Sequence, residues 1–385
     1  MYKFSILKEV NAREWDDNLK KSNCATFFQS AKFLEVQSKG RHPLFLYVLD
    51  ENDKIKGQLA ITITKSYTPY STNKLNKFTK MISNLGARGT WVAGPIIHSN
   101  DKSTRIKILK TFLNALEIVA QKNKLTIIDG YSPPQDLQVD QNYKNEFKMN
   151  GYKIEKFITY VSDLKNPIEE LWNKIEKKAR NDVTRAKRRK ITIKELERFD
   201  DFIEFRSLIK KWAKTKGIQV SDQSKLIKND WQLYKNRIQR FFLAYQDNEV
   251  ISGLRISCFN DIAYTHQVLS TYSKATSLGG ALLTWYAIEW AKNNGLKIYD
   301  YSGVKSPPKN ENELKKYNEQ WLGLNDYKKK WGGNEFPYYH FVKTQKGSAY
   351  KLFRLLSRPD FTYREYKKKH FRRPLKNSML DRFSK

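Results

Sequence analysis

The chain contains 385 residues, of which 39% are hydrophobic and 14% aromatic, enough apolar material for two folded domains and too much for a disordered chain. Its 72 lysines and arginines outnumber 40 acidic residues, which gives a formal net charge of +32. A charge of this sign indicates a polyanionic partner, which would be a nucleic acid, an anionic membrane face or a phosphorylated substrate.

A general lysine bias of the host proteome is the alternative explanation for this charge. The basic residues are clustered, however. Residues 174–190 hold nine basic and two acidic side chains, and residues 362–385 hold the same numbers. Because a uniform bias would spread the charge evenly, the clusters favour a polyanionic partner.

Two cysteines, Cys24 and Cys258, lie in different halves of the chain, which is typical of a reducing compartment rather than of a disulfide scaffold. The five histidines show no spacing typical of metal ligands, so no zinc site is expected. The first ten residues lack the apolar core of a signal peptide, and no window approaches the roughly 20 apolar residues that span a membrane. We therefore expect a cytosolic protein, or one that rests on the inner membrane surface.

The first half of the chain predicts a hairpin, a helix and a buried strand, in that order. Residues 44–57 read as a strand and a tight polar turn that lead into the alternating strand Gln58–Lys65. Residues Ile106–Gln121 have the apolar spacing of a helix, and 125–130 read as a buried strand that ends near Asp129.

The second half repeats this order of elements. A strand, turn and strand over 241–259 are followed by a helix at Ala281–Asn293 and a buried strand at 296–301. Strands with interposed helices predict a mixed α/β sheet in each half. The loop expected at 274–281 lacks the residues that a pyrophosphate-binding loop requires, because only Gly279 and Gly280 are present, so coenzyme A binding is not expected.

Between the halves, Asn166-Pro167 ends a strand and begins the most basic segment of the chain. Apolar residues recur there at steps of four, four, four and three, which predicts one helix over 171–190. They are Leu171, Ile175, Ala179, Val183 and Ala186. The other faces are almost free of acids, so this helix suits a phosphate backbone or a pyrophosphate-bearing lipid better than a plain solvated surface.

Two segments near the end of the second half carry further signals. Residues 299–304 read as a buried strand that ends in a glycine turn. Residues 323–333 read as a glycine-bounded loop that presents Tyr327 and three lysines. The remainder of the second half, 199–240, predicts short helices without a heptad run.

These segments resemble the Fem family of aminoacyl-tRNA-dependent peptidyltransferases, which add amino acids to peptidoglycan precursors. The resemblance covers nearly the whole chain to about residue 343. It rests on 299–304, on Gly-Leu before Tyr327-Lys328, and on the helix 171–186 with Arg180-Asn181 in the matching place. Weaker matches are Phe27-Phe28-Gln29-Ser30 with Phe33 in place of Trp, and the Gly-Pro turn in 88–95.

The resemblance implies an α/β (α+β) fold of two tandem GNAT-like domains, each a mixed twisted sheet flanked by helices, with a cleft between them. The domains would be 1–161 and 162–344. A short helix at Ser348–Leu356 and the rest of 345–385 would pack back on the first domain. The absence of a heptad run implies the compact form, without the coiled-coil arm that some relatives carry.

The resemblance also implies a catalytic group of Lys328, Tyr327 and Asp300. Lys328 would stabilise the oxyanion that forms when an amine attacks an aminoacyl ester. Tyr327 stands where the family more often has Phe. Asp300 would orient the amine or Lys328, or it would cap its own turn, as Asp commonly does. No general base is evident, and proximity would supply much of the rate.

Further site residues follow from the same resemblance and from the charge pattern. The residues expected to contact the acceptor substrate are Lys39, Arg180, Tyr264, His266 and Ser302. His266 shares a strand face with Tyr264 and is expected at the edge of the cleft rather than in catalysis. The residues expected to hold tRNA or phosphate are Lys177, Lys187, Arg188, Lys329 and Lys330.

The predicted function is aminoacyl transfer from aminoacyl-tRNA, as co-substrate, to an amine of an anionic, phosphate-bearing precursor. The enzyme would act as a monomer without a bound cofactor or metal. One alternative is a GNAT-fold N-acyltransferase that uses acyl-CoA or another acyl donor, including an aminoacyl-lipid synthase. A second alternative is a non-enzymatic protein that binds nucleic acid or an anionic membrane.

Overall fold

The structure is a computed structural model. It describes residues 2–37, 42–65, 86–215, 223–270, 274–307, 319–345 and 347–348. The strands are β1 (Lys3–Leu7), β2 (His42–Leu49), β3 (Ile55–Thr64), β4 (Arg88–Trp91), β5 (Ile96–Ile97), β6 (Ile127–Tyr131), β7 (Lys153–Asp163), β8 (Thr192–Glu195), β9 (Gln239–Gln246), β10 (Glu249–Phe259), β11 (Ile262–Ser270), β12 (Ile298–Asp300), β13 (Val304–Lys305) and β14 (Asn334–Thr344). The helices are α1 (Ala12–Leu19), the short 3-10 helix η1 (Phe27–Gln29), α2 (Ala31–Gln37), α4 (Lys102–Lys122), α5 (Gln141–Met149), α6 (Ile168–Lys174), α7 (Lys177–Arg188), α8 (Asp201–Thr215), α9 (Gln223–Lys235), α10 (Lys274–Asn293) and α12 (Glu319–Lys329).

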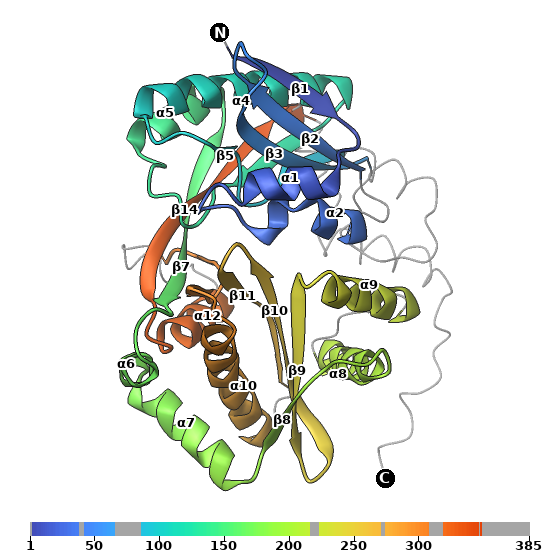
Figure 1. The fold of residues 1–385 in the computed structure, drawn as a ribbon, viewed down its shortest axis with the longest axis vertical. Coiled ribbons are helices and arrows are strands. Elements are labelled where there is room, and N and C mark those ends of the chain that lie inside the picture. The colour runs from blue at the N-terminus through green and yellow to red at the C-terminus, as the bar shows by residue number, and fades with distance from the viewer. Residues whose placement is uncertain are drawn as a thin grey trace, which may run out of the picture.

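The described strands form one continuous mixed sheet that runs through both halves (Figure 1). Its main path is β1-β2-β3-β4-β6-β14-β7-β12-β11-β10-β9-β8, while β5 pairs with β3 and β13 with β7. The hairpins β2–β3 and β9–β10 are antiparallel, whereas β4–β6 and β11–β12 are parallel. The duplicated order predicted from the sequence is therefore confirmed, and so is the mixed α/β fold class.

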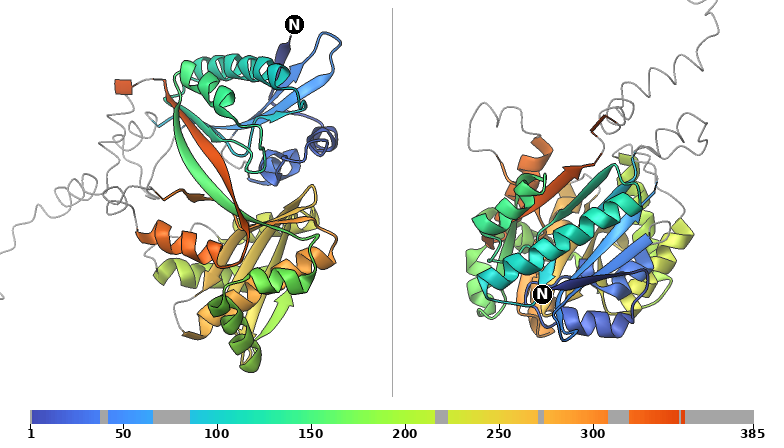
Figure 2. Two further views of the ribbon diagram at one scale, coloured as in Figure 1. Left: turned by 90° about the vertical axis from the view of Figure 1, so that its left-hand side faces the viewer. Right: turned by 90° about the horizontal axis from the view of Figure 1, so that it is seen from above.

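The last strand, β14, joins the two halves. It lies between β6 and β7 and is antiparallel to both, with His340 opposite Tyr131 and Tyr338 opposite Phe157. In the left view of Figure 2, β7 and β14 run side by side from one half of the molecule toward the other. Side chains from β6, β7 and β14 thus reach the second half.

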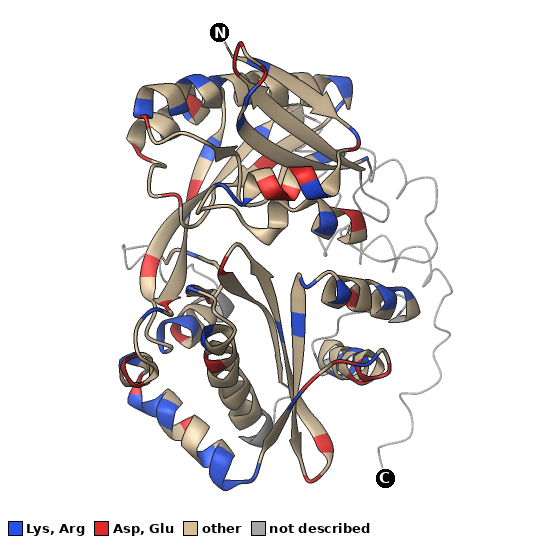
Figure 3. Ribbon diagram, viewed as in Figure 1, with Lys and Arg blue, Asp and Glu red and all other residues tan. Residues whose placement is uncertain are grey.

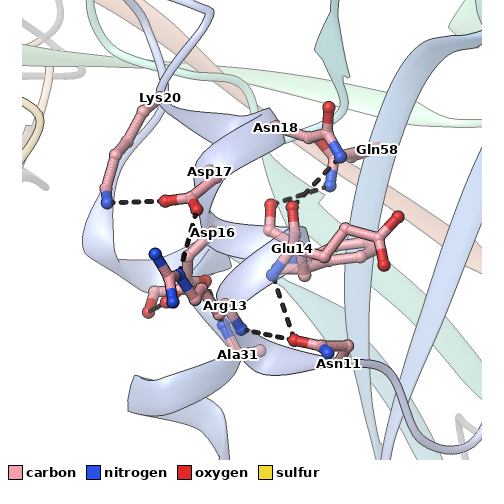
Figure 4. A network of polar contacts seen from close by, with 11 residues as sticks. Asn11, Arg13, Glu14, Asp16, Asp17, Asn18, Lys20, Ala31 and Gln58 are labelled. Carbon is pink, nitrogen blue, oxygen red and sulfur yellow. Dashed lines mark hydrogen bonds and ion pairs between the residues drawn. The ribbon is translucent and has the colours of Figure 1, made fainter.

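In the first half, α4 and α5 pack on one side of the sheet and α1 and α2 on the other. A buried polar network holds α1 and α2 together (Figure 4). The Asp16 carboxylate accepts hydrogen bonds from the Ser30 hydroxyl at 2.8 Å and from the Ala31 N–H at 2.7 Å. The Gln58 side chain in β3 donates to the Trp15 carbonyl at 3.1 Å, which ties α1 to the sheet.

In the second half, helices cover both faces of the sheet. On one face α7 and α10 pack against Phe242, Leu254 and Ile256. On the other face α8 packs against Phe241 and Leu243, with α9 beside it. Because neighbouring residues of a strand point to opposite faces, α7 and the α8–α9 pair lie on opposite sides of the sheet.

Three local predictions are wrong. The single helix over 171–190 is two helices, α6 and α7, because Ile175 and Glu176 adopt extended backbone angles where the chain meets the segment after α12. The loop predicted at 323–333 is largely the helix α12, which buries polar residues and therefore lacks an apolar stripe. The loop predicted at 274–281 forms the first turns of α10.

Other predictions hold or remain open. The region 199–240 forms α8, α9 and the start of β9, without a coiled-coil arm. The domain division at residue 161 stays a prediction, since β7 continues to Asp163 and pairs with both β14 and β12. The helix predicted at 348–356, apart from its first residue, and the basic tail lie outside the described residues.

Candidate active site

The candidate site lies where β11 and β12 separate. These parallel strands pair over 262–264 and 298–300, after which the chain turns through Ser302, whose φ is +64°, and enters β13. A bulge in β11 sits at the same level, because Arg255 of β10 faces Gln267 while Ile256 faces Thr265. His266 is therefore the extra residue, and such bulges often redirect groups beside active sites.

Lys328, in the last turn of α12, is directed at this turn. Its ammonium group donates hydrogen bonds to the carbonyl oxygens of Ser302 at 2.7 Å and Gly303 at 2.8 Å. Only 8% of the residue is exposed. Burial lowers the pKa of Lys328 to about 8, and the negative charge of Asp300 opposes part of that change. The cation is thus held in a desolvated place rather than in open water, with one further N–H available when it is protonated.

Asp300, at the end of β12, is 1% exposed. Its carboxylate accepts hydrogen bonds from Thr159 of β7 at 2.5 Å, from Gln135 at 2.7 Å and from the Ser302 N–H at 2.7 Å. Burial raises the pKa of Asp300, while these hydrogen bonds and the charge of Lys328 oppose the rise. The turn-capping alternative is therefore confirmed, and the same carboxylate also supports the positive charge of Lys328.

Tyr327 anchors α12 to the second-half core. Its hydroxyl forms a hydrogen bond with Thr284 of α10 at 2.8 Å, and its ring lies against Trp331. Lys330 lies over the Tyr327 ring, with its ammonium nitrogen 4.5 Å from the ring centroid, while Lys329 is exposed. The structure therefore places Tyr327 where it positions the neighbouring lysine.

The basic helix α7 begins beside the end of α12. The Glu176 N–H, just before α7, donates to the Lys330 carbonyl at 2.9 Å. Gly332 has a φ of +79°, and a Cβ there would come within 2.5 Å of the Lys174 carbonyl oxygen. Burial lowers the pKa of Lys330, and the nearby positive charge of Lys178 adds to that lowering. The sequence-predicted lysines after Lys328 and the basic helix thus share one region.

The apolar stripe of α7 is buried as expected, and its outer face is strongly basic (Figure 3). An open hollow of about 720 Å³ lies along this face. Its lining residues are Lys177, Lys178, Asn181, Thr184, Arg185 and Arg188. Lys187 is exposed on the same helix, and Arg180 is half-buried with a hydrogen bond to Asn173 at 3.4 Å.

Tyr264 and His266 lie at the contact between the halves. Both rings pack against Phe27, at centroid distances of 5.3 and 5.8 Å. Tyr264 is buried, and its hydroxyl has no hydrogen-bond partner within the described part of the chain. Burial and the charge of Arg255 lower the pKa of His266 well below its ordinary value. A neutral His266 agrees with a polar residue at the edge of a site.

The remaining predicted residues are placed as follows. Ser302 carries the turn beneath Lys328, and its hydroxyl donates to the Thr265 carbonyl across the divergence of β11 and β12. Lys39 lies outside the described residues.

The sequence analysis missed three residues of this site. Gln135 and Thr159 bind Asp300, and the Tyr338 hydroxyl lies so close to Gly303 that a Cβ there would come within 1.5 Å of it. They come from the loop after β6, from β7 and from β14, all far from 300 in sequence. No local motif marks them, because the pairing of β14 with β7 brings them to the site.

The corresponding position in the first half is filled. The Trp91 indole covers Gly130, where a Cβ would come within 2.0 Å of the ring. Asp129, the counterpart of Asp300, is bound by Arg88 at 2.6 Å and by His340 at 2.8 Å. The repeat therefore leaves its buried lysine–carboxylate arrangement in the second half.

No family model and no curated protein sequence matches the chain. Solved structures do match over most of its length. FemX has a TM-score of 0.67 at 15% identity and covers 92% of this chain and 100% of its own. L-PGS from Bacillus licheniformis has a TM-score of 0.53 at 13% identity, with 91% and 98% covered. A tandem GNAT protein from the clavulanic acid biosynthesis pathway has a TM-score of 0.53 at 11% identity, with 89% and 98% covered.

At these identities the likeness establishes the fold and nothing finer. The chain has the tandem GNAT fold, as expected from the sequence, and its structure is similar to that of FemX. Within the described residues, no helix is long and apolar enough to cross a bilayer.

Proposed function

We propose that this protein is an aminoacyltransferase that moves an amino acid from aminoacyl-tRNA to an amine of a peptidoglycan-type precursor. One observation carries the proposal: a buried lysine, Lys328, is held by two backbone carbonyls at the point where two strands of the second-half sheet diverge. A fixed cation in a desolvated place stabilises a developing oxyanion far better than a cation in water does.

The reaction needs little else from the protein. The acceptor amine attacks the ester carbonyl, a C–N bond forms, and the carbonyl oxygen becomes an oxyanion beside Lys328. The ester C–O bond then breaks, and the ribose oxygen of the tRNA leaves with a proton that the attacking nitrogen loses. Asp300 keeps Lys328 charged, and the Ser302 and Gly303 carbonyls fix its position.

The donor end of a tRNA would lie along α7. The contact between Glu176 and Lys330 places the start of this basic helix next to the end of α12. Phosphate contacts from Lys177, Lys187 and Arg188 would supply sequence-independent affinity. The aminoacyl ester would then reach Lys328 at the end of the acceptor strand.

The choice of a cell-wall type acceptor is supported by the motif resemblance and by the likeness of the fold to FemX. The buried Tyr264 hydroxyl, which has no partner in the described chain, is a group that an acceptor peptide would satisfy after a small shift of the ring. Lys39, Arg180 and His266 are proposed to contact the same acceptor.

A transfer assay with charged tRNA and a precursor peptide tests the proposal directly. We expect the amino acid to appear on the peptide amine, and transfer from acyl-CoA with none from charged tRNA would overturn the choice of donor. Reversing the charge of Arg180 and Lys187 together should weaken tRNA binding and flatten its salt dependence. An unchanged salt slope would remove α7 from the RNA interface.

A further inference from the structure

A second cationic surface lies on the far side of the second half from α7. It consists of the outer faces of α8 and α9, hereafter the α8–α9 face (Figures 1 and 3). The exposed residues of α8 recur every three or four positions and form one stripe: Ile203, Ser207, Lys210, Lys211 and Lys214. Those of α9 do the same: Ser224, Lys225, Lys228, Gln232 and Lys235. The two helices pack side by side, so their outward stripes form one surface.

The α8–α9 face presents no acidic side chain, because every acid of the two helices has an internal partner. Asp201 accepts from Lys194 at 2.8 Å and Glu204 from the Tyr245 hydroxyl at 2.6 Å. Asp230 is buried between Arg206, at 2.6 Å, and Arg255. The outward lysines form no ion pair with any described residue. The face is therefore uniformly positive, unlike an ordinary surface helix, which mixes both signs.

Apolar and aromatic side chains accompany these lysines. Ile203 is 51% exposed, and Phe199, just before α8, is 38% exposed. Trp231 and Tyr234 of α9 stack at 5.5 Å and remain partly exposed, with the Lys235 ammonium 5.8 Å from the Trp231 ring centroid. Lysines with Trp, Tyr and aliphatic residues on one helical face are typical of helices that lie in a membrane interface.

We propose that the α8–α9 face binds the surface of an anionic phospholipid bilayer. The lysines would contact phosphate headgroups, and Ile203 and Phe199 would enter the boundary between headgroups and acyl chains. Compact lysine charges and exposed apolar residues suit a bilayer better than an RNA backbone, which would leave Ile203 in water. Since α7 lies across the sheet, a bound membrane would leave the α7 surface open to another polyanion.

Sedimentation with lipid vesicles tests this proposal. The vesicles are made of equal parts phosphatidylglycerol and phosphatidylcholine, with pure phosphatidylcholine as reference. The test variant reverses three charges on α8, Lys210→Glu, Lys211→Glu and Lys214→Glu. The matched control variant reverses three on α7, Lys177→Glu, Lys187→Glu and Arg188→Glu. Both change the net charge equally, so a difference between them reports the location of the contact rather than total charge.

We expect the α8 variant to lose at least about tenfold in affinity for the anionic vesicles, and the α7 variant to keep most of it. An equal loss in both would show that net charge alone attracts the vesicles, which overturns the proposal. A loss of tRNA binding in the α8 variant, with vesicle binding retained, would assign the face to RNA instead. If the α8 variant fails to fold, Lys225→Glu, Lys228→Glu and Lys235→Glu replace it.

The proposal goes beyond aminoacyl transfer and is measured without donor or acceptor. Its failure would leave the catalytic proposal untouched. Conversely, an inactive enzyme that still distinguishes the two vesicle types would leave the membrane contact standing.

Discussion

Replacing Lys328 with Met tests the centre of the proposed mechanism. Methionine keeps the length and apolar volume of the lysine stem and removes only the ammonium group. The variant should lose about 100- to 1000-fold in kcat, or about 3–4 kcal/mol of barrier lowering, the usual effect of deleting one oxyanion donor. Substrate KM should change little, because Lys328 acts on the reacting carbonyl rather than on the body of the tRNA.

The stability of this variant follows from two opposing effects. The displacement of the Lys328 pKa from 10.5 to about 8 corresponds to about 3 kcal/mol of unfavourable charge burial, which Met removes. Met also leaves the Ser302 and Gly303 carbonyls without their donor, at a cost of about 1–3 kcal/mol each. We therefore expect a folded protein whose free energy of unfolding is within a few kcal/mol of the wild type.

The pH dependence separates these effects. The folded pKa of Lys328 lies below the unfolded value, so between pH 8 and 10.5 the unfolded chain binds more protons. Over that range the wild type should gain stability relative to Lys328→Met as pH rises. Activity should show the opposite trend and fall above about pH 8, because only the protonated lysine stabilises an oxyanion.

Single-turnover transfer from charged tRNA is the assay, run alongside urea denaturation of the same preparations. Lys329→Met is the matched control, because Lys329 is adjacent, equally charged and exposed. Lys328→Arg should recover part of the rate. Near-normal turnover by a folded Lys328→Met, or equal losses in Lys328→Met and Lys329→Met, would refute the oxyanion role.

Three further predictions follow from the surroundings of the site. Asp300→Asn should shift the alkaline limit of activity to lower pH, because the negative charge that raises the Lys328 pKa is lost; an unchanged limit in the pH–rate profile would separate the two groups. Gly332→Val should lower the free energy of unfolding by about 2 kcal/mol or more, seen in urea titrations, because its φ of +79° and the carbonyl 2.5 Å away exclude a side chain. Asp230→Leu should cost about 3–5 kcal/mol by the same measurement, since it leaves two buried guanidinium groups facing each other; a loss below about 1 kcal/mol would contradict that account of the α8–α9 interior.

Periodicity and turn residues were sufficient to predict the repeated elements. The hairpins at 44–65 and 241–259 alternate strongly between two polar turns, and α4 and the later part of α10 carry clear apolar spacing. The five apolar residues of the basic segment are all buried, as their spacing indicated. These features are local, because each depends on residues within one or two turns of one another.

Local patterns were misleading where the chain buries polar groups or bends against a neighbour. Asn325 and Lys328 face inward from α12, so a buried helix carried the signature of a lysine-rich loop. The break between α6 and α7 contains no proline or glycine. It forms because the Glu176 N–H binds the Lys330 carbonyl, about 150 residues away in the chain.

The sequence by itself determined the duplicated α/β architecture, the basic helix and the choice of Lys328, since each is written in short-range spacing or in a short motif. Only the tertiary structure decided what surrounds that lysine. Insertion of β14 between β6 and β7 brings Thr159, Gln135 and Tyr338 to Asp300 and Gly303. The physical reason is that strand pairing joins residues without regard to their distance along the chain, so the groups that desolvate and fix the ammonium leave no pattern near residue 328.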